Sequence, residues 1–257
     1  MRRIESAQNP RIKELRKRQS SKSFARDFLL IEGRKLLREA LASGIDVREV
    51  FVTSDAWEQE KRWLGPLENG AVAVTLIGQA ALERLSTLET PPGILAIAAR
   101  PAAPAHAAPR RFGALLFSIR DPGNLGALIR SAEAAGFEFV ACSKDTADPM
   151  QPKVLRASMG SCFRVPVFRV ADTEEYLEGM RKSGVRLYGL QPRDGKILTE
   201  TEVKAPALVL IGSESHGLPA DLPDYHPVSI PMAGKVESLN AAMAATVCFY
   251  YFAFFSR

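Results

Sequence analysis

Arg130 is the one cation in a run of small and apolar residues, and this placement favours a chemical role over packing. The run, DPGNLGALIRSAEAAG, extends from Asp121 to Gly136 and follows an apolar stretch at 114–119 that we expect to be a strand. Asn124 suits the N-cap of a helix over 125–135, because its side-chain oxygen can accept an orphan backbone N–H. The alternative is an arginine that buries its stem and reaches solvent, and this run alone does not separate the two.

Two later loops carry polar residues at the ends of expected strands. In LVLIGSESHGLP, a strand at 207–211 ends before Gly212, and Glu214 lies between it and Gly217. After a strand at 228–231, Ser238 is expected to cap the last helix, with Asn240 in its first turn. Ligands of parallel α/β sheets bind beyond the carboxyl ends of strands. We therefore expect the three loops to form one site.

Composition excludes several classes of protein. The chain has 257 residues and 46% hydrophobic residues, which allows one large domain or two modest ones. Its three cysteines are odd in number and far apart, which fits a reducing, cytoplasmic location, and with three scattered histidines they predict no metal site. Neither G-x-G-x-x-G nor G-x-x-x-x-G-K-[ST] occurs, so dinucleotide and P-loop chemistry are not expected.

Positive charge is concentrated at the amino-terminal end. Residues 1–38 hold twelve Lys or Arg and four Asp or Glu, a balance of +8, so the remaining residues sum to −3. A basic end on a near-neutral body favours a polyanionic partner, with nucleic acid ahead of a membrane surface. A solvated basic helix without a partner is the alternative.

The order of elements predicts two α/β domains. Alternating strands and helices fill residues 1–100, the Pro/Ala-rich segment 101–109 is typical of a linker, and 110–257 alternate again. Short apolar strands separated by helices predict a mostly parallel sheet covered on both faces. The expected strands of this second domain lie at 114–119, 138–142, 164–168, 186–190, 207–211 and 228–231, and its helices at 125–135, 152–159, 173–183 and 238–255.

The last helix is nearly all apolar over 239–255, about the shortest length that crosses a bilayer. Asn240 and an alanine-rich first half favour a buried or dimer-forming helix instead, and we expect no membrane association. The small residues Ala241, Ala244 and Ala245 would allow close packing against another helix.

Three motifs together resemble a known family. N-x-G-A-x-x-R-S-A at Asn124–Ala132, I-G-S-E-x-x-G-L at Ile211–Leu218 and I-P-M-x-G-x-x-E-S-L-N at Ile230–Asn240 resemble the three motifs of the SpoU/TrmH family. Its members are S-adenosylmethionine-dependent RNA ribose 2′-O-methyltransferases of the SPOUT superfamily. N-P-x-I-K-x-L, F-L-x-E-G and T-P-P-G-I-L-A resemble pieces of a ribosomal-protein-like substrate-binding domain fused to such enzymes.

The resemblance implies a fold, a cofactor and a set of site residues. It implies that the second domain is a SPOUT fold whose C-terminal trefoil knot holds S-adenosylmethionine, and that the protein is a homodimer through its last helix. The implied cofactor-binding residues are Leu190, Gln191, Gly212, Gly217, Ile230, Met232 and Leu239. The implied catalytic residues are Asn124, Arg130, Glu214, Ser238 and Asn240.

The resemblance also implies a reaction, methyl transfer to a ribose 2′-hydroxyl. Family accounts often make the arginine that matches Arg130 a general base, but a guanidinium with a pKa above about 12 resists deprotonation. We favour electrostatic stabilisation of the developing alkoxide. Ribosomal RNA is favoured over transfer RNA because of the ribosomal-protein-like domain. The alternatives are a tRNA 2′-O-methyltransferase, or a non-catalytic RNA-binding or ribosome-assembly protein that kept the fold.

Overall fold

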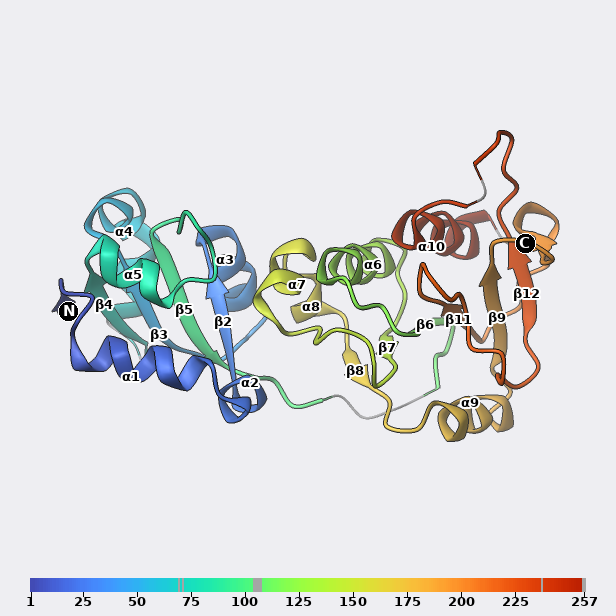
Figure 1. The fold of residues 1–257 in the computed structure, drawn as a ribbon, viewed down its shortest axis with the longest axis horizontal. Coiled ribbons are helices and arrows are strands. Elements are labelled where there is room, and N and C mark those ends of the chain that lie inside the picture. The colour runs from blue at the N-terminus through green and yellow to red at the C-terminus, as the bar shows by residue number, and fades with distance from the viewer. Residues whose placement is uncertain (69, 71, 104–107, 237, 256–257) are drawn as a thin grey trace. The chain divides into compact units, whose positions relative to one another are not determined.

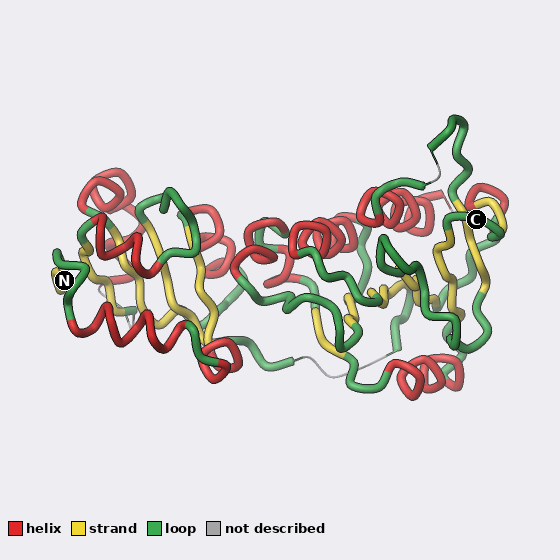
Figure 2. Tube along the Cα trace, viewed as in Figure 1, coloured by secondary structure: helices red, strands yellow, loops and turns green. Residues whose placement is uncertain are grey.

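The computed structural model describes residues 1–257 apart from 69, 71, 104–107, 237 and 256–257. The chain divides into two units, Met1–Ala102 with Met150–Phe163, and Ala103–Pro149 with Arg164–Arg257. Figure 2 distinguishes the helices, strands and loops of each. Two predictions fall partly outside the described residues: the middle of the 101–109 linker, and residue 71, the first residue of a strand that the sequence predicts over 71–76.

The first unit is built on a five-stranded mixed sheet with the order β1-β4-β3-β5-β2. β4 runs parallel to β1 and β3, whereas β5 runs antiparallel to β3 and β2. The elements are β1 Arg2–Ile4, α1 Pro10–Gln19, α2 Lys22–Asp27, β2 Phe28–Glu32, α3 Arg34–Ala42, β3 Val47–Val52, α4 Ser54–Glu68, β4 Ala73–Ile77, α5 Gln79–Leu85 and β5 Ile94–Ala99.

Helices α1, α2 and α5 bury their apolar residues in one cluster with the sheet. Ile12 and Leu15 of α1, Phe24 of α2 and Leu82 of α5 join Phe51 of β3 in this core. The other side chains of α1 are mostly exposed and many are basic, so one helix combines a core-forming face with a cationic face.

A segment from the second half of the sequence packs with this first unit. It spans Met150–Phe163 and contains α7, Pro152–Ala157, with α8, Ser161–Arg164, at its end. Arg156 Nη1 donates to Glu32 Oε2 at 2.6 Å, and this carboxylate also accepts from Ser86 Oγ at 2.5 Å and from the Thr87 backbone N–H at 2.8 Å. The domain prediction took 110–257 as continuous, and local sequence patterns do not reveal this long-range ion pair.

The second unit contains a seven-stranded sheet with the order β10-β12-β9-β11-β6-β7-β8 (Figure 1). Every neighbouring pair of these strands is parallel. The elements are β6 Phe112–Leu116, α6 Pro122–Ala134, β7 Val140–Cys142, β8 Val167–Arg169, α9 Thr173–Lys182, β9 Arg186–Gln191, β10 Lys196–Ile197, the 3₁₀ turn Leu198–Glu200, β11 Ala207–Ile211, β12 His226–Ser229, α10 Ala241–Tyr250 and the π-helical turn Tyr251–Phe255.

Helices cover both faces of this sheet, as predicted. Helices α6 and α10 lie together on one side and α9 lies on the other (Figure 1). Leu177 and Met180 of α9 pack into a core with Leu208 of β11. On the other face, the ring of Phe249 in α10 contacts the ring of Phe137, with 4.4 Å between the ring centroids. The prediction of a mostly parallel, doubly covered sheet is confirmed, and the trefoil knot stays a prediction. None of the described helices is both long enough and apolar enough to cross a membrane.

Candidate active site

The parallel register brings four loops to one edge of the second sheet. Leu116 at the end of β6 pairs with Ile211 at the end of β11, so the chain leaves both strands side by side. Gln191 at the end of β9 likewise pairs with Ser229 at the end of β12. The loops that carry the predicted site residues therefore begin as neighbours, as expected for carboxyl ends of parallel strands.

Helix α6 begins earlier than predicted, and its cap is Asp121 rather than Asn124. Asp121 Oδ1 accepts the backbone N–H of Asn124 at 2.8 Å, and Pro122 occupies the first helical position. Proline is favoured there because its missing N–H would be unpaired in any case and its φ is already helical. The prediction of Asn124 as N-cap is therefore wrong, and its side chain is released for a contact outside the helix.

That contact is with Glu214, in the loop after β11. Asn124 Nδ2 donates to Glu214 Oε1 at 2.9 Å, and Asn240 Nδ2 donates to the same oxygen. Asn240 Nδ2 also lies 3.3 Å from Asn124 Oδ1. Three residues from three separate segments thus form one hydrogen-bonded cluster, which we call the amide–carboxylate cluster.

Asn240 serves two elements at once. Its Oδ1 accepts the backbone N–H of Ala242 at 2.9 Å and that of Met243 at 3.3 Å, so Asn240 is the N-cap of α10. The prediction that Ser238 caps this helix is wrong, because the helix begins only at Ala241. An asparagine accepts through its oxygen while it donates through its nitrogen, so one side chain makes both contacts.

The glycines of the loop after β11 allow a turn that other residues would obstruct. Ser213 and Gly217 exchange two backbone hydrogen bonds of 2.9 and 3.1 Å, and Gly217 has a φ of +67°. A Cβ on Gly212 would lie 2.1 Å from the carbonyl carbon of Gly217. Glycine is needed at 212 for this close approach and favoured at 217 by the left-handed backbone.

A cavity of about 650 Å³ opens beside this loop. All seven residues predicted to bind the cofactor line it, as do Glu214, Ser238 and Asn240. The cavity also takes in residues that the sequence analysis did not assign to the site, namely Pro192, Ile211, Ser213, Ser215, His216, Leu218, Ala241 and Ala244. Most of these adjoin a predicted residue in the chain, so proximity to the motifs was the available signal.

The lining of this first cavity suits a nucleoside with a charged tail. Leu190, Ile230 and Leu239 supply apolar walls, while the Glu214 carboxylate provides negative charge at one side. The volume lies within the range of about 300–1,000 Å³ that is typical of small-molecule sites. These residues therefore fit S-adenosylmethionine, whose adenine ring is flat and whose sulfonium is positive.

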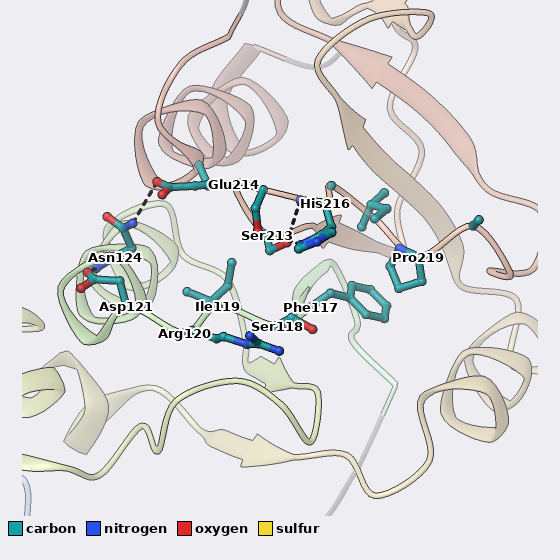
Figure 3. A pocket seen from close by; sticks show the side chains of 15 residues that line it. Phe117, Ser118, Ile119, Arg120, Asp121, Asn124, Ser213, Glu214, His216 and Pro219 are labelled. Carbon is teal, nitrogen blue, oxygen red and sulfur yellow. Dashed lines mark hydrogen bonds between the residues drawn. The ribbon is translucent and has the colours of Figure 1, made fainter.

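A second cavity of about 570 Å³ lies on the other side of the same loop (Figure 3). Residues 117–121 and Asn124 form one wall, and residues 213–220 form another. The loop 213–218 and Ala241 line both cavities. The amide–carboxylate cluster lies where the two cavities meet, because Glu214 belongs to both.

Arg130 lies apart from the other predicted catalytic residues. It is exposed on α6, lines neither of the two cavities, and forms no hydrogen bond or ion pair with any described residue. Its neighbour Ser131 contacts Thr246 of α10 through their hydroxyl oxygens at 2.7 Å. The structure therefore brings Asn124, Glu214, Ser238 and Asn240 to the two cavities and leaves Arg130 on the surface close to α10.

Comparisons with known proteins bear on both parts of the chain. The SpoU rRNA Methylase family matches residues 112–250, and the MRM3-like substrate binding domain matches residues 9–96. The 23S rRNA (guanosine(2553)-2′-O)-methyltransferase RlmP of Bacillus subtilis is 33% identical over 254 residues, which cover 98% of this chain and 99% of that protein.

Two solved structures share the fold across nearly the whole chain. An S-adenosylmethionine-bound rRNA methyltransferase from Sinorhizobium meliloti matches with a TM-score of 0.83 and 26% identity, covering 98% of this chain and 97% of that chain. The SpoU methyltransferase AviRb from Streptomyces viridochromogenes, also in complex with S-adenosylmethionine, has a TM-score of 0.81 and 30% identity, covering 96% and 97%. With the three motifs placed around one site, these matches show that the chain belongs to the SpoU rRNA methylase family.

Proposed function

We propose that this protein transfers a methyl group from S-adenosylmethionine to a ribose 2′-hydroxyl of ribosomal RNA. The observation that carries the proposal is the junction of two cavities at Glu214, where the amide–carboxylate cluster separates a cofactor-sized space from a second space. A chain with this family membership and this site is an RNA 2′-O-ribose methyltransferase.

The first cavity is the proposed cofactor site, held by Leu190, Gln191, Gly212, Gly217, Ile230, Met232 and Leu239. When bound there, S-adenosylmethionine would supply an electrophilic methyl group for the ribose oxygen. The protein contributes position and charge, and alignment alone is worth roughly 7–11 kcal/mol.

The amide–carboxylate cluster is proposed to orient the reacting groups. Glu214 accepts two amide donors through Oε1, so its carboxylate is held in one orientation with Oε2 available at the junction of the cavities. Asn124 and Asn240 come from opposite ends of the second unit's sequence, and each is anchored by its own helix. Ser238 lines the cofactor cavity, where its hydroxyl supplies a further polar contact.

Arg130 is proposed to contact the phosphate and hydroxyl of the target nucleotide and to stabilise alkoxide character. Within the described residues of one chain its guanidinium has no ion pair that would occupy it. A guanidinium keeps its charge at neutral pH, which suits electrostatic stabilisation better than proton abstraction.

Residues 1–100 are proposed to form a domain that holds RNA, with 101–109 as linker and 110–257 as the methyltransferase domain. Five of the twelve cations in residues 1–38 pair with an acid: Arg3, Arg11, Arg26, Arg34 and Arg38. On α1, Lys13, Arg16 and Lys17 are exposed and have no ion pair among the described residues. We call Lys13, Arg16 and Lys17 the α1 cations and propose that they contact RNA phosphates.

We propose a homodimer whose interface is the outer face of α10. Ala245 is buried and Ala241 and Ala244 line the cofactor cavity, so the small residues are used within the chain. The exposed face consists instead of larger residues, with Met243 and Phe254 64% and 60% exposed and Val247 and Tyr250 between them. A continuous apolar face of this kind indicates an interface. Because Arg130 lies on α6, which packs against α10, a dimer through this face would bring Arg130 near the partner.

The ribosomal target is supported by the names of the relatives, among them a 23S rRNA methyltransferase of nearly equal length. A ribosomal RNA substrate agrees with a cytoplasmic location. Mapping ribose methylation in RNA from cells with and without the gene tests the function. Loss of one 2′-O-methyl site in ribosomal RNA is the expected result. A loss confined to transfer RNA would show that the substrate is transfer RNA instead. An unchanged methylation pattern would overturn the proposal.

A further inference from the structure

The second cavity contains two side chains with no role in the account above, Arg120 and His216. Arg120 directly precedes the cap of α6, and His216 lies in the loop that separates the two cavities. In Figure 3 the two side chains lie on opposite sides of the hollow, with Asn124 and Glu214 at one end of it.

Arg120 offers a free cation at this cavity. It is exposed and has no hydrogen bond or ion pair with any residue in the described ranges. A guanidinium presents a planar fork of donors that matches a phosphate, and it is more weakly hydrated than an ammonium group. The nearest acids of the cavity, Asp121 and Glu214, lie at the end that holds Asn124, so a phosphate is repelled there and favoured at the end that holds Arg120.

The turn that carries Arg120 is held by buried hydroxyl groups. Ser118 has a φ of +52°, a left-handed conformation that is uncommon for residues other than glycine and costs energy. Its backbone N–H donates to Ser143 Oγ at 2.9 Å, and Thr146 Oγ1 donates to the Leu116 carbonyl at 3.1 Å. Ser143 and Thr146 are both buried, so an internal network maintains a turn that directs residues 118–120 along the cavity wall.

His216 is held in place by the same kind of local contact. Its backbone N–H donates to Ser213 Oγ at 3.2 Å, and its Nδ1 lies 2.8 Å from Ser215 Oγ. Nε2 has no hydrogen-bond partner among the described residues, so one nitrogen of an oriented ring remains for a ligand. A ring nitrogen of this kind can donate to or accept from a base edge according to its tautomer.

We propose that the second cavity holds the target nucleotide of the RNA, an inference that rests on the proposed function. The ribose lies at the Asn124 and Glu214 end, where its hydroxyls meet amide and carboxylate groups beside the cofactor cavity. Arg120 binds a phosphate that flanks this ribose, and His216 contacts the base. Because Arg130 of the same chain lines neither cavity, the arginine that reaches this ribose is Arg130 of the partner subunit. Both Arg120 and His216 are proposed to bind the RNA. Arg120 lines the second cavity alone, whereas His216 also lines the cofactor cavity.

The test compares three variants, Arg120→Ala, Arg120→Lys and His216→Ala, with the control Arg181→Ala. The control removes an exposed arginine of α9 that lines neither cavity. The probes are ribosomal RNA from cells lacking the gene and S-adenosylmethionine with a tritiated methyl group. Methylation kinetics, RNA binding at several salt concentrations and calorimetric binding of S-adenosylmethionine are measured for each variant.

Arg120→Ala is expected to raise the KM for RNA about tenfold. It should also reduce the slope of the logarithm of the RNA association constant against the logarithm of salt concentration by roughly 0.7–0.9, the contribution of one phosphate contact. Arg120→Lys keeps the slope with weaker binding, and His216→Ala weakens RNA binding with the slope unchanged. The affinity for S-adenosylmethionine is unchanged in Arg120→Ala, Arg120→Lys and Arg181→Ala, because neither arginine lines the cofactor cavity. Thermal melting at the wild-type temperature establishes that each variant is folded, as expected for exposed side chains.

Three outcomes overturn the assignment. If Arg120→Ala and His216→Ala behave like Arg181→Ala in every RNA measurement, the target nucleotide binds elsewhere. Loss of S-adenosylmethionine binding in Arg120→Ala would assign the cavity to the cofactor. If wild-type protein methylates no RNA, the proposed function fails and the inference fails with it, whereas an active wild type with indifferent variants refutes the inference alone.

Discussion

Asn124 donates its side-chain amide to Glu214 Oε1 at 2.9 Å, although ninety residues separate the two in the sequence. The contact exists because Asp121 takes over the capping of α6 and leaves the Asn124 side chain unused by its own helix. Asn240 completes the cluster from the start of α10. The cluster therefore joins the start of α6, the loop after β11 and the start of α10 into a single polar centre at the carboxyl ends of the strands.

Glu214→Gln tests the charge at this centre. An amide retains one acceptor oxygen but no negative charge, so its bonds to Asn124 and Asn240 lose their charge-assisted character. We expect methyl transfer to slow by about 10- to 100-fold, because hydrogen bonds to charged groups are worth about 1.5–3 kcal/mol. Single-turnover kinetics with tritiated S-adenosylmethionine measure the rate. Asp224→Asn, which neutralises an exposed carboxyl in the same unit, is the control and should leave the rate unchanged.

Asn240→Asp and Asn240→Ala separate the two roles of this residue. Aspartate can still cap α10 but cannot donate to Glu214 and places a second carboxylate against it. Alanine loses both, and loss of the cap costs about 1 kcal/mol. Both variants should be nearly inactive, but Asn240→Asp should retain more of the α10 capping energy in thermal melts. Wild-type activity in Asn240→Asp would show that the amide donor is dispensable.

Arg130→Lys asks whether the arginine acts through its fork or through its charge alone. A bidentate contact with phosphate and hydroxyl depends on the planar guanidinium, which lysine does not reproduce. We expect activity to fall nearly as far as in Arg130→Ala, with cofactor affinity unchanged because Arg130 lies outside the cofactor cavity. Near-wild-type turnover of the lysine variant would contradict a bidentate role.

Neutralising the α1 cations together, Lys13→Ala, Arg16→Ala and Lys17→Ala, should weaken RNA binding. Each phosphate contact contributes roughly 0.7–0.9 to the slope of log K against log salt, so the slope should fall by about 2 to 3. The control removes three paired arginines, Arg3, Arg26 and Arg48, with the same change in net charge. If the two triple variants have equal slopes, the weaker RNA binding is due to the change in net charge and not to the α1 cations themselves. Deleting residues 1–38 is a poorer test, since it removes Ile12, Leu15 and other core residues.

Met243→Glu combined with Val247→Glu tests the outer face of α10. Two buried charges in an apolar interface are costly, so sedimentation velocity should show a monomer. Because both side chains are exposed within one chain, the melting temperature of the monomer should change little. Met159→Glu, at an exposed methionine of the first unit, should remain dimeric. A wild-type protein that sediments as a monomer would contradict the dimer itself.

Much of the fold and of the candidate site could be predicted because the relevant signals are local. Apolar runs bounded by turn residues placed every strand of the second sheet except β10. In the first sheet, the apolar run at 94–99 predicts a strand, and β5 has the same bounds, Ile94–Ala99. The motifs marked residues that parallel pairing must bring to one edge, and the roles of those residues stay a prediction. The predicted cofactor residues all line one cavity.

What only the tertiary structure decided depends on partners distant in the chain. Asn124 and Ser238 were assigned as caps because each stands before an apolar run, whereas Pro122 and the late start of α10 give those roles to Asp121 and Asn240. Three further features follow from packing between segments that no local pattern connects. They are the ion pair of Arg156 with Glu32, the division of the site into two cavities by the 213–218 loop, and the position of Arg130 outside both cavities. Residue types and spacing determined which chemistry is present, and long-range packing determined which groups meet.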